Sequence, residues 1–184
     1  MFAEKPTLTG ARVKLLPVGP EHVEGLLALV ADPEVARLTG SHGEIDPEAA
    51  RQWYATRGEH ADRLDLAIMA DGTYVGEVVL NELDRHNLSC NLRIALIGSR
   101  VFGKGYGTEA IELVLDHAFT TTPLHRISLG VFSFNERARH VYKKVGFVEE
   151  GVERDSLLWE GEWYDSVMMS VLRPEWRTRS RELA

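Results

Sequence analysis

Several short segments of the chain alternate hydrophobic with polar residues, which is the pattern of half-buried β-strands. In the first half of the sequence this pattern predicts strands over Arg12–Val18, Leu64–Ala70, Tyr74–Leu80 and Leu88–Ile97. Asp71 and Gly72 separate two of these strands, and an Asp-Gly pair is a strong signal for a tight hairpin turn. We therefore expect antiparallel strand pairing in this half.

Between the first strands the hydrophobic spacing changes to that of helices. Pro20 is suited to a first helical position. Hydrophobic residues follow it at helical spacing, at Val23, Leu26, Leu27 and Val30. Asp46 precedes Pro47 and Glu48, so it is expected to cap a second helix that runs to about Glu59.

The second half of the chain predicts two more helices between strands. One helix follows a glycine cluster and carries a single hydrophobic stripe, formed by Ile111, Val114, Leu115, Ala118 and Phe119. Asn135 opens the other helix, and Gly146 is expected to end it in the left-handed conformation. Strands are predicted over Arg126–Phe132, Phe147–Glu153 and Tyr164–Leu172.

This order of elements predicts an α+β (mixed α/β) fold. A helix that joins two strands of one sheet requires a parallel crossover, so part of the central sheet should be parallel. No internal repeat and no linker divides the 184 residues, and we expect one domain over residues 1–184. The polar tail, residues 173–184, is expected to be a short appendage with Trp176 packed back on the domain.

The composition excludes several functions. A formal net charge of −7 argues against a nucleic-acid-binding surface, which needs an excess of Lys and Arg. Cys90 is the single cysteine and the histidines lack metal-ligand spacing, so neither a disulfide nor a metal site is expected. The segment Met1–Gly10 lacks the hydrophobic run of a signal peptide, and no hydrophobic stretch reaches the ~20 residues that span a bilayer. We expect a cytoplasmic protein without a membrane partner.

The glycine cluster is the first candidate for a binding site, and it comprises Gly103, Lys104, Gly105, Tyr106, Gly107 and Thr108. Alternate glycines let the backbone approach a ligand, and the helix start beyond them offers unpaired N–H groups. Such a loop suits phosphate oxygens, although a flexible turn capped by Thr108 explains it equally well. It matches neither the Walker pattern nor the dinucleotide-binding pattern, because Lys104 lies inside the cluster and the glycine spacing is G-x-G-x-G.

Asn135 and Tyr142 form a second candidate, directly after a predicted strand. Each residue alone has a structural explanation, Asn135 as a helix cap and Tyr142 as part of the buried helix face. Both residues, however, come one strand crossover after the glycine cluster. They are therefore expected on the side of the sheet where folds of this kind bind their ligands.

Three separated blocks of sequence, together with two flanking segments, carry a resemblance to a known family. The blocks are Phe102–Ala110, Leu124–Val131 and Asn135–Phe147, and the flanking segments are Leu8–Pro17 and Gly161–Asp165. In order and spacing they resemble the GNAT acetyltransferase superfamily, in the branch of ribosomal-protein N-terminal acetyltransferases and spermidine N-acetyltransferases. The resemblance spans about residues 8–172. It implies a twisted central sheet with a splayed parallel strand pair, acetyl-CoA as the acyl donor, an amine as the acceptor and no metal.

The resemblance also implies how the glycine cluster is used. The family's pyrophosphate loop, [Gln/Arg]-x-x-Gly-x-[Gly/Ala], falls on Phe102, Gly105 and Gly107. Backbone N–H groups over residues 103–108 would then hold the pyrophosphate, with Lys104 adding charge at the rim. Phe102 departs from the pattern, so a polar contact that the family often has must be absent or replaced. An alignment of this pattern that starts at Arg100 also fits, but it places the loop two residues too early relative to the predicted start of the helix.

Other site residues follow from the same resemblance. The strand before the loop is implied to pair with pantetheine at Ala95, Leu96 and Ile97. Asn135 matches the family's Asn that faces the CoA arm, and Tyr142 matches the Tyr near the thioester sulfur.

Acyl transfer to an amine needs a proton donor for the departing thiolate, a group that polarises the carbonyl, and a base. The Tyr142 phenol, with an ordinary pKa of about 10, is protonated at neutral pH and suits the first role. A backbone N–H near Leu96 suits the second. Glu82, at the end of a strand expected to border the acceptor cleft, is the predicted base, with Glu77 and Asp84 as alternatives. A water relay would serve equally well.

Acidic residues in two regions predict a cationic acceptor. They are Glu77, Glu82 and Asp84 near one end of the expected cleft, and Glu44, Asp46 and Glu48 in the segment expected to cover it. Such a concentration attracts a primary amine. The competing acceptor is a peptide N-terminus recognised mainly through backbone and apolar contacts.

Several functions stay open at the level of sequence. Transfer of a larger acyl group such as succinyl is not separated from acetyl transfer, because no residues identify the acyl pocket. A non-catalytic acyl-CoA-binding module is disfavoured by the presence of both Asn135 and Tyr142. A nucleotide-phosphate enzyme is disfavoured by the missing Walker and dinucleotide patterns. The oligomeric state, including a homodimer, is also open.

Overall fold

A mixed sheet forms the centre of the molecule in the computed structural model, which describes residues 1–43 and 45–176. Along the sheet the strand order is β1-β2-β3-β4-β5-β6-β8-β7. The strands are β1 (Leu8–Thr9), β2 (Lys14–Pro17), β3 (Leu64–Ala70), β4 (Thr73–Asp84), β5 (Ser89–Leu96), β6 (Arg126–Phe132), β7 (Val148–Trp159) and β8 (Glu162–Leu172). β5 and β6 are parallel, and the other neighbouring strands are antiparallel.

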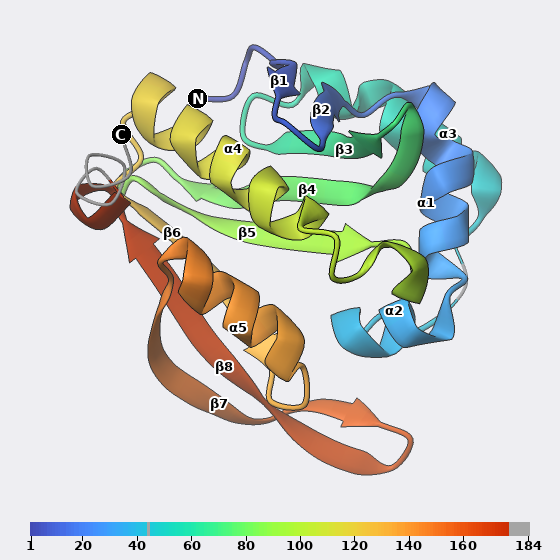
Figure 1. Ribbon diagram of the computed structural model, residues 1–184, viewed down its shortest axis with the longest axis vertical. Coiled ribbons are helices and arrows are strands. Elements are labelled where there is room, and N and C mark those ends of the chain that lie inside the picture. Colours follow the sequence, from blue (N-terminus) through green and yellow to red (C-terminus); the bar gives the residue numbers. More distant parts are fainter. Residues whose placement is uncertain (44, 177–184) are drawn as a thin grey trace.

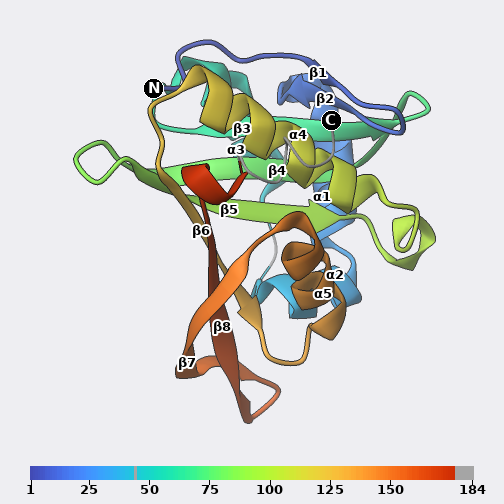
Figure 2. The same ribbon diagram turned by 60° about the vertical axis from the view of Figure 1, so that its left-hand side comes forward.

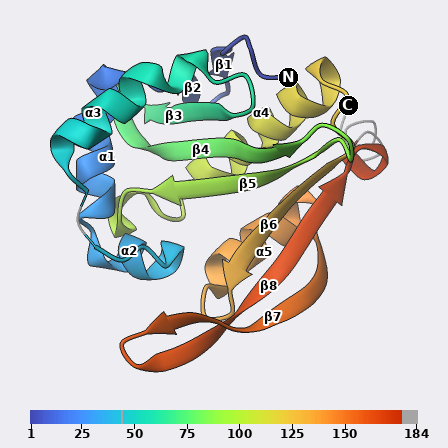
Figure 3. The ribbon, with the colours of Figure 1, turned by 180° about the vertical axis from the view of Figure 1, so that it is seen from behind.

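Helices cover both faces of this sheet (Figure 1). They are α1 (Val23–Val30), α2 (Pro33–Thr39), α3 (Pro47–Thr56), α4 (Tyr106–Thr121) and α5 (Glu136–Val145), with short 3-10 turns at Pro20–His22, Arg57–Glu59 and Ser99–Val101. α4 and α5 lie in front of the sheet in Figure 1, whereas α3 lies in front of it when the molecule is seen from behind in Figure 3. The hydrophobic stripe predicted for α4 is buried against the sheet and is part of the larger core.

The parallel pair is short. β5 and β6 pair over three positions, from Ser89 opposite Arg126 to Asn91 opposite Ser128. Beyond these positions the two strands diverge, so that β3, β4 and β5 form one arm and β6, β8 and β7 the other (Figures 1 and 3). The predicted mixed α/β fold with a splayed parallel pair is confirmed.

α2 is the helix that the hydrophobic spacing does not predict. Its cap is Asp32, whose carboxylate accepts hydrogen bonds from the backbone N–H groups of Glu34 at 2.9 Å and Val35 at 3.3 Å. The Asp-Pro-Glu sequence that predicts α3 is also present here, so the capping signal existed. The helix has seven residues, which is too few for a hydrophobic period to be recognised.

Several strand boundaries also differ from the prediction. The strand expected over Arg12–Val18 is shorter and corresponds to β2, while β1 precedes it as a strand that was not predicted, with residues 10–13 as the turn between them. β4 continues to Asp84, and the β7–β8 hairpin is longer than expected and protrudes from the domain (Figure 2). Trp176 is 7% exposed and packs near Phe119, as expected, while residues 177–184 of the predicted tail lie outside the described residues.

Glu109 ties the N-terminal turn to the start of α4. Its carboxylate accepts hydrogen bonds from the backbone N–H groups of Ala11 at 2.9 Å, Arg12 at 2.8 Å and Val13 at 2.8 Å. Its own N–H donates to the carbonyl of Gly105 at 3.1 Å. Because Glu109 lies in the first turn of α4, one side chain holds the turn between β1 and β2 beside the glycine cluster.

We expect Glu109→Ala to lower the free energy of unfolding by about 2 kcal/mol, because hydrogen bonds to a charged group contribute about 1.5–3 kcal/mol and this carboxylate is half-buried. Denaturant unfolding at neutral pH measures the change. Asp116→Ala, at an exposed acid on the same helix, is the control and should stay within about 0.5 kcal/mol of the parent. Equal losses in the two variants would contradict the anchoring role.

Candidate active site

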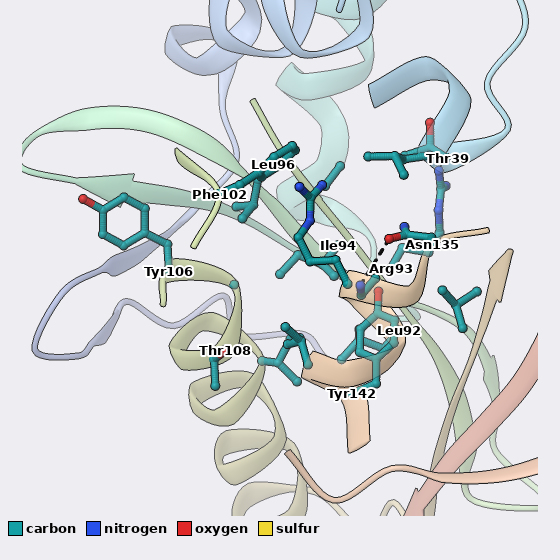
Figure 4. A pocket seen from close by; sticks show the side chains of 18 of the residues that line it. Thr39, Leu92, Arg93, Ile94, Leu96, Phe102, Tyr106, Thr108, Asn135 and Tyr142 are labelled. Atoms are coloured by element: carbon teal, nitrogen blue, oxygen red, sulfur yellow. Dashed lines mark hydrogen bonds between the residues drawn. The ribbon is translucent and has the colours of Figure 1, made fainter. Parts of the chain in front are cut away.

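A cavity of about 500 Å³ lies where β5 and β6 separate (Figure 4). The start of α4 and one face of α5 line it on one side of the sheet. β4, α2 and the end of β6 contribute its other walls. The cavity therefore reaches through the gap between the two arms, and molecules on opposite faces of the sheet can meet in it.

The glycine cluster forms the mouth of the cavity on the α4 side. Gly103 and Gly105 have φ angles of 75° and 82°, which are left-handed conformations that glycine adopts without steric cost. α4 begins at Tyr106. Within the described part of the chain, the backbone N–H groups of residues 103–108 have no hydrogen-bond partner. Six consecutive free donors at a helix N-terminus fit a pyrophosphate group.

Most residues predicted for the loop line the cavity, namely Phe102, Gly103, Gly105, Tyr106, Gly107 and Thr108. Lys104 does not line it. The Lys104 ammonium instead lies 6.0 Å from the centre of the Tyr106 ring, on the exposed outer side of the loop.

Two arginines that the sequence did not single out lie beside this loop. The Arg137 guanidinium lies over the Phe102 ring, 3.6 Å from its centre, and Arg137 lines the cavity. A Cβ atom added to Gly105 would lie 3.3 Å from Nη1 of Arg12, whose backbone is held by Glu109. Phe102, the residue that departs from the family pattern, thus supports a cation instead of supplying a polar group itself.

The backbone of β5 forms the edge of the gap. Ile97 donates its N–H to the carbonyl of Val75 at 2.9 Å, and the Ala95 carbonyl points at Gly76. Because alternate residues of a strand turn their backbone groups to opposite sides, those of Ile94 and Leu96 face the opened side. Of the three residues predicted to contact pantetheine, only Leu96 turns its backbone groups to the opened side. Ile97 does not line the cavity, whereas Ile94, which was not predicted, does.

Asn135 and Tyr142 enter the cavity from α5 (Figure 4). The Asn135 side-chain oxygen accepts a hydrogen bond from the backbone N–H of Ala138 at 3.1 Å, so this residue caps α5 and also faces the cavity. Tyr142 is 8% exposed, and burial raises the pKa of its hydroxyl to about 12. The phenol therefore keeps its proton at any physiological pH.

Glu77 lines the cavity from β4, on the opposite arm from Tyr142. Its carboxylate accepts a hydrogen bond of 2.5 Å from the hydroxyl of Tyr54 in α3. Burial raises the pKa of Glu77 above its ordinary value, and the Tyr54 hydrogen bond and the Arg93 guanidinium oppose this rise. The sequence offered Glu77 as an alternative base, and the structure brings it to the cavity.

The profile of the acetyltransferase (GNAT) domain matches residues 12–148. The chain belongs to the GNAT acetyltransferase family. The spermidine N(1)-acetyltransferase of Vibrio cholerae is 32% identical over 122 residues, which cover 66% of this chain and 70% of that protein. The ribosomal protein uS5 alanine N-acetyltransferase of Escherichia coli is 32% identical over 80 residues, 44% of this chain and 41% of that protein.

Among solved structures, the spermidine N-acetyltransferase of Vibrio cholerae in complex with CoA and spermine has the same fold as this GNAT domain. The TM-score is 0.84 at 22% identity, and the match covers 91% of this chain and 99% of that one. The family resemblance is therefore confirmed, and this GNAT chain is an acetyl-CoA-dependent N-acetyltransferase that acts on amines.

The structure does not bring Glu82 to the cavity of this GNAT domain. Glu82 is exposed and lies near the far end of β4, next to a bulge between Asn81 and Asp84. This end of β4 pairs with the start of β5, whereas the gap opens at the end of β5. The prediction that Glu82 borders the acceptor cleft is wrong, because the antiparallel register places Glu77 there instead.

The predicted concentration of acidic groups around the acceptor is also wrong for most of its members. The Asp84 carboxylate accepts hydrogen bonds from the backbone of His86 and Asn87 in the β4–β5 turn. Asp46 caps α3, and Glu48 lies near Arg51 on the surface of that helix. Glu44 lies outside the described residues. Of the five that the structure describes, Glu77 alone lines the cavity of the GNAT domain.

The described residues contain no group of three or more His, Cys, Asp or Glu side chains placed to hold a metal ion. No helix within residues 1–43 and 45–176 combines the length and the hydrophobicity needed to cross a membrane.

We expect Gly105→Asp to weaken acetyl-CoA binding by about tenfold or more, because a carboxylate would stand among the donors that fit the pyrophosphate. Isothermal titration calorimetry measures the affinity. Gly72→Asp is the matched control, since Gly72 also has a positive φ, of 76°, but lies in the β3–β4 turn away from the cavity. Unchanged affinity in a folded Gly105→Asp variant would show that the phosphates bind elsewhere.

Proposed function

We propose that this GNAT enzyme transfers an acetyl group directly from acetyl-CoA to a primary amine, with Glu77 as the base and Tyr142 as the acid. The observation that carries the proposal is that Glu77 and Tyr142 reach one cavity from the two separated arms of the sheet. A base on one side of the gap and an acid on the other suit a reaction between molecules that enter from opposite faces.

The donor side of the proposal rests on unpaired backbone groups. The free N–H groups of residues 103–108 would hold the pyrophosphate, and the cations Arg12 and Arg137 beside them would add favourable charge. Backbone groups of Ile94 and Leu96 would pair with pantetheine. Acetyl-CoA supplies the thioester whose acetyl group is transferred.

The chemistry on the acceptor side begins with Glu77. Its carboxylate takes a proton from the amine, directly or through a water, and the amine nitrogen forms a bond to the carbonyl carbon. A backbone N–H of β5 near Leu96 stabilises the negative charge on the carbonyl oxygen. When the carbon–sulfur bond breaks, the Tyr142 hydroxyl gives its proton to the sulfur. Burial favours this role, because it keeps Tyr142 protonated before the transfer.

A homodimer and a cytoplasmic location are parts of the same proposal. Four large hydrophobic side chains of the β7–β8 hairpin are exposed, at Val148, Val152, Leu158 and Trp163. A second copy of the chain would bury these exposed side chains, and this supports the homodimer. The use of acetyl-CoA supports the cytoplasmic location.

Tyr142→Phe should lower kcat by about 10²–10⁴-fold and leave acetyl-CoA affinity unchanged, because only the proton donor is removed. Free-thiol release with the best acceptor gives kcat, and calorimetry gives the affinity. Tyr164→Phe, at a tyrosine of β8 whose hydroxyl contacts Glu162, is the control and should behave as the parent. If the Tyr142→Phe enzyme kept full turnover, Tyr142 would be a core residue and not the acid.

Glu77 must be ionised to act as a base, so kcat/KM should fall as the pH drops through an apparent pKa above the ordinary glutamate value. Tyr54→Phe removes a hydrogen bond that favours the ionised form, and it should move this fall to higher pH by about one unit. Glu77→Gln should lower kcat/KM by about 10²–10⁴-fold at neutral pH. All three profiles are measured with one acceptor, so that the ionisation of the amine is common to them. An identical profile in the Tyr54→Phe variant would exclude Glu77 as the base.

A further inference from the structure

The charge of the cavity does not suit an acceptor that carries several positive charges. Of the described residues that line the cavity, Glu77 is the one acid, whereas Arg93, Arg137 and Lys144 are cations. Arg137 and Lys144 belong to α5, which lines the side that fits the donor. Arg93 belongs to β5, and donor binding does not account for its positive charge in the cavity.

Arg93 lies on the same face of the sheet as Glu77. In the β4–β5 register, Arg93 is opposite Val79 and Glu77 is opposite Ala95. Positions two apart on a strand share a face, so the two charged side chains are diagonal neighbours. Leu92 and Ile94, the sequence neighbours of Arg93, pack instead on the face that α4 covers. Arg93 therefore belongs to the acceptor side.

Arg93 has no hydrogen-bonded partner among the described residues, although its charge favours the ionised form of Glu77. Its side chain is exposed to the cavity, and in the described part of the chain its guanidinium makes no hydrogen bond or ion pair. Three other arginines of the domain are each paired with a carboxylate, in Arg63–Asp65, Arg126–Glu150 and Arg139–Glu149. A free guanidinium in a cavity, next to a carboxylate that already has a partner in Tyr54, is arranged to receive an anion.

We propose that Arg93 binds a carboxylate of the acceptor, and that the acceptor is an α-amino acid whose amine faces Glu77. This inference rests on the proposed function, since it uses Glu77 as the base. A guanidinium forms paired, charge-assisted hydrogen bonds with a carboxylate. A polyamine would bring a second ammonium group toward the same guanidinium, and the two like charges would repel each other.

The other acceptor-side walls indicate the kind of amino acid. Val35 and Leu38 of α2, Val79 of β4 and Phe132 of β6 all line the cavity. These hydrophobic side chains line the same cavity as Glu77 and Arg93, and the described lining residues include no further acid to bind a cationic side chain. The acceptor's own side chain is therefore apolar.

The test compares acceptors that differ only in the carboxylate. Leucine, leucinamide and 3-methylbutylamine share one side chain, as do valine, valinamide and 2-methylpropylamine. Spermidine and the remaining standard amino acids complete the panel, with free-thiol release as the readout. We expect kcat/KM of the parent enzyme to be about 10- to 100-fold higher for the best amino acid than for its amide or its decarboxylated amine.

Variants of Arg93 connect this preference to the guanidinium. Arg93→Gln should lower the ratio of kcat/KM for the amino acid to kcat/KM for the decarboxylated amine by about 10- to 100-fold, and leave acetyl-CoA affinity unchanged. The ratio is the readout because Arg93 also favours the ionised form of Glu77, and the loss of that effect changes both acceptors alike. Arg93→Lys should cause a smaller loss than Arg93→Gln, because lysine keeps the positive charge but cannot form the paired hydrogen bonds of a guanidinium with a carboxylate. Arg85→Gln, at an exposed arginine of the β4–β5 turn, is the control and should resemble the parent.

Two kinds of failure are distinguishable. If the parent enzyme acetylates spermidine or a simple amine better than every amino acid, or if amide and acid are equal, the carboxylate site is overturned while N-acetylation stands. If no amine in the panel releases thiol, the proposed function fails together with the inference.

Discussion

β5 and β6 share three paired positions before they separate, and the position of every candidate site residue depends on this separation. A parallel pair that continued would satisfy the backbone groups of both strands and close the sheet. Because the pairing stops, Ile94 and Leu96 keep backbone groups directed into an open gap. A buried open edge is costly without a partner, so the edge is suited to a ligand that supplies the missing hydrogen bonds. The cavity, with its access from both faces, is a consequence of the same break.

The two sides of the gap use different chemistry. On the proposed donor side the groups available for recognition are mainly backbone N–H groups at the start of α4, in a loop where glycines remove the side chains. Glu109 holds the turn between β1 and β2 against this helix start, and so keeps the Arg12 backbone beside the loop. The acceptor side, by contrast, consists of side chains from β4, β5 and α2. In the proposed arrangement, donor recognition would be insensitive to most side-chain changes, whereas acceptor choice would change with single residues such as Arg93.

Glu77 and Glu82 show why the acceptor side is hard to infer. Both are glutamates of the same strand, five residues apart, and nothing local distinguishes a base from a solvated charge. β4 runs antiparallel to β5, so its first half lies beside the open end of the gap and its second half beside the closed end. Placement near Tyr54, in a helix more than twenty residues earlier, then gives Glu77 its burial and its hydrogen bond. The roles of the two glutamates differ because of pairing between strands and contacts distant in sequence.

By itself the sequence determined the order of strands and most helices, the phosphate-suited loop, and Asn135 and Tyr142 as candidates, because these depend on local spacing, capping and glycine placement. The family could be recognised from the same local blocks. Tertiary structure alone decided that Glu77 rather than Glu82 reaches the cavity, that Arg137 stacks on Phe102, and that Arg93 lines the cavity on the same face of the sheet as Glu77. It also decided that Ile97 uses its N–H within the sheet while Leu96 does not. Each of these outcomes depends on strand register and on the packing of segments distant along the chain, and neither is encoded in the spacing of neighbouring residues.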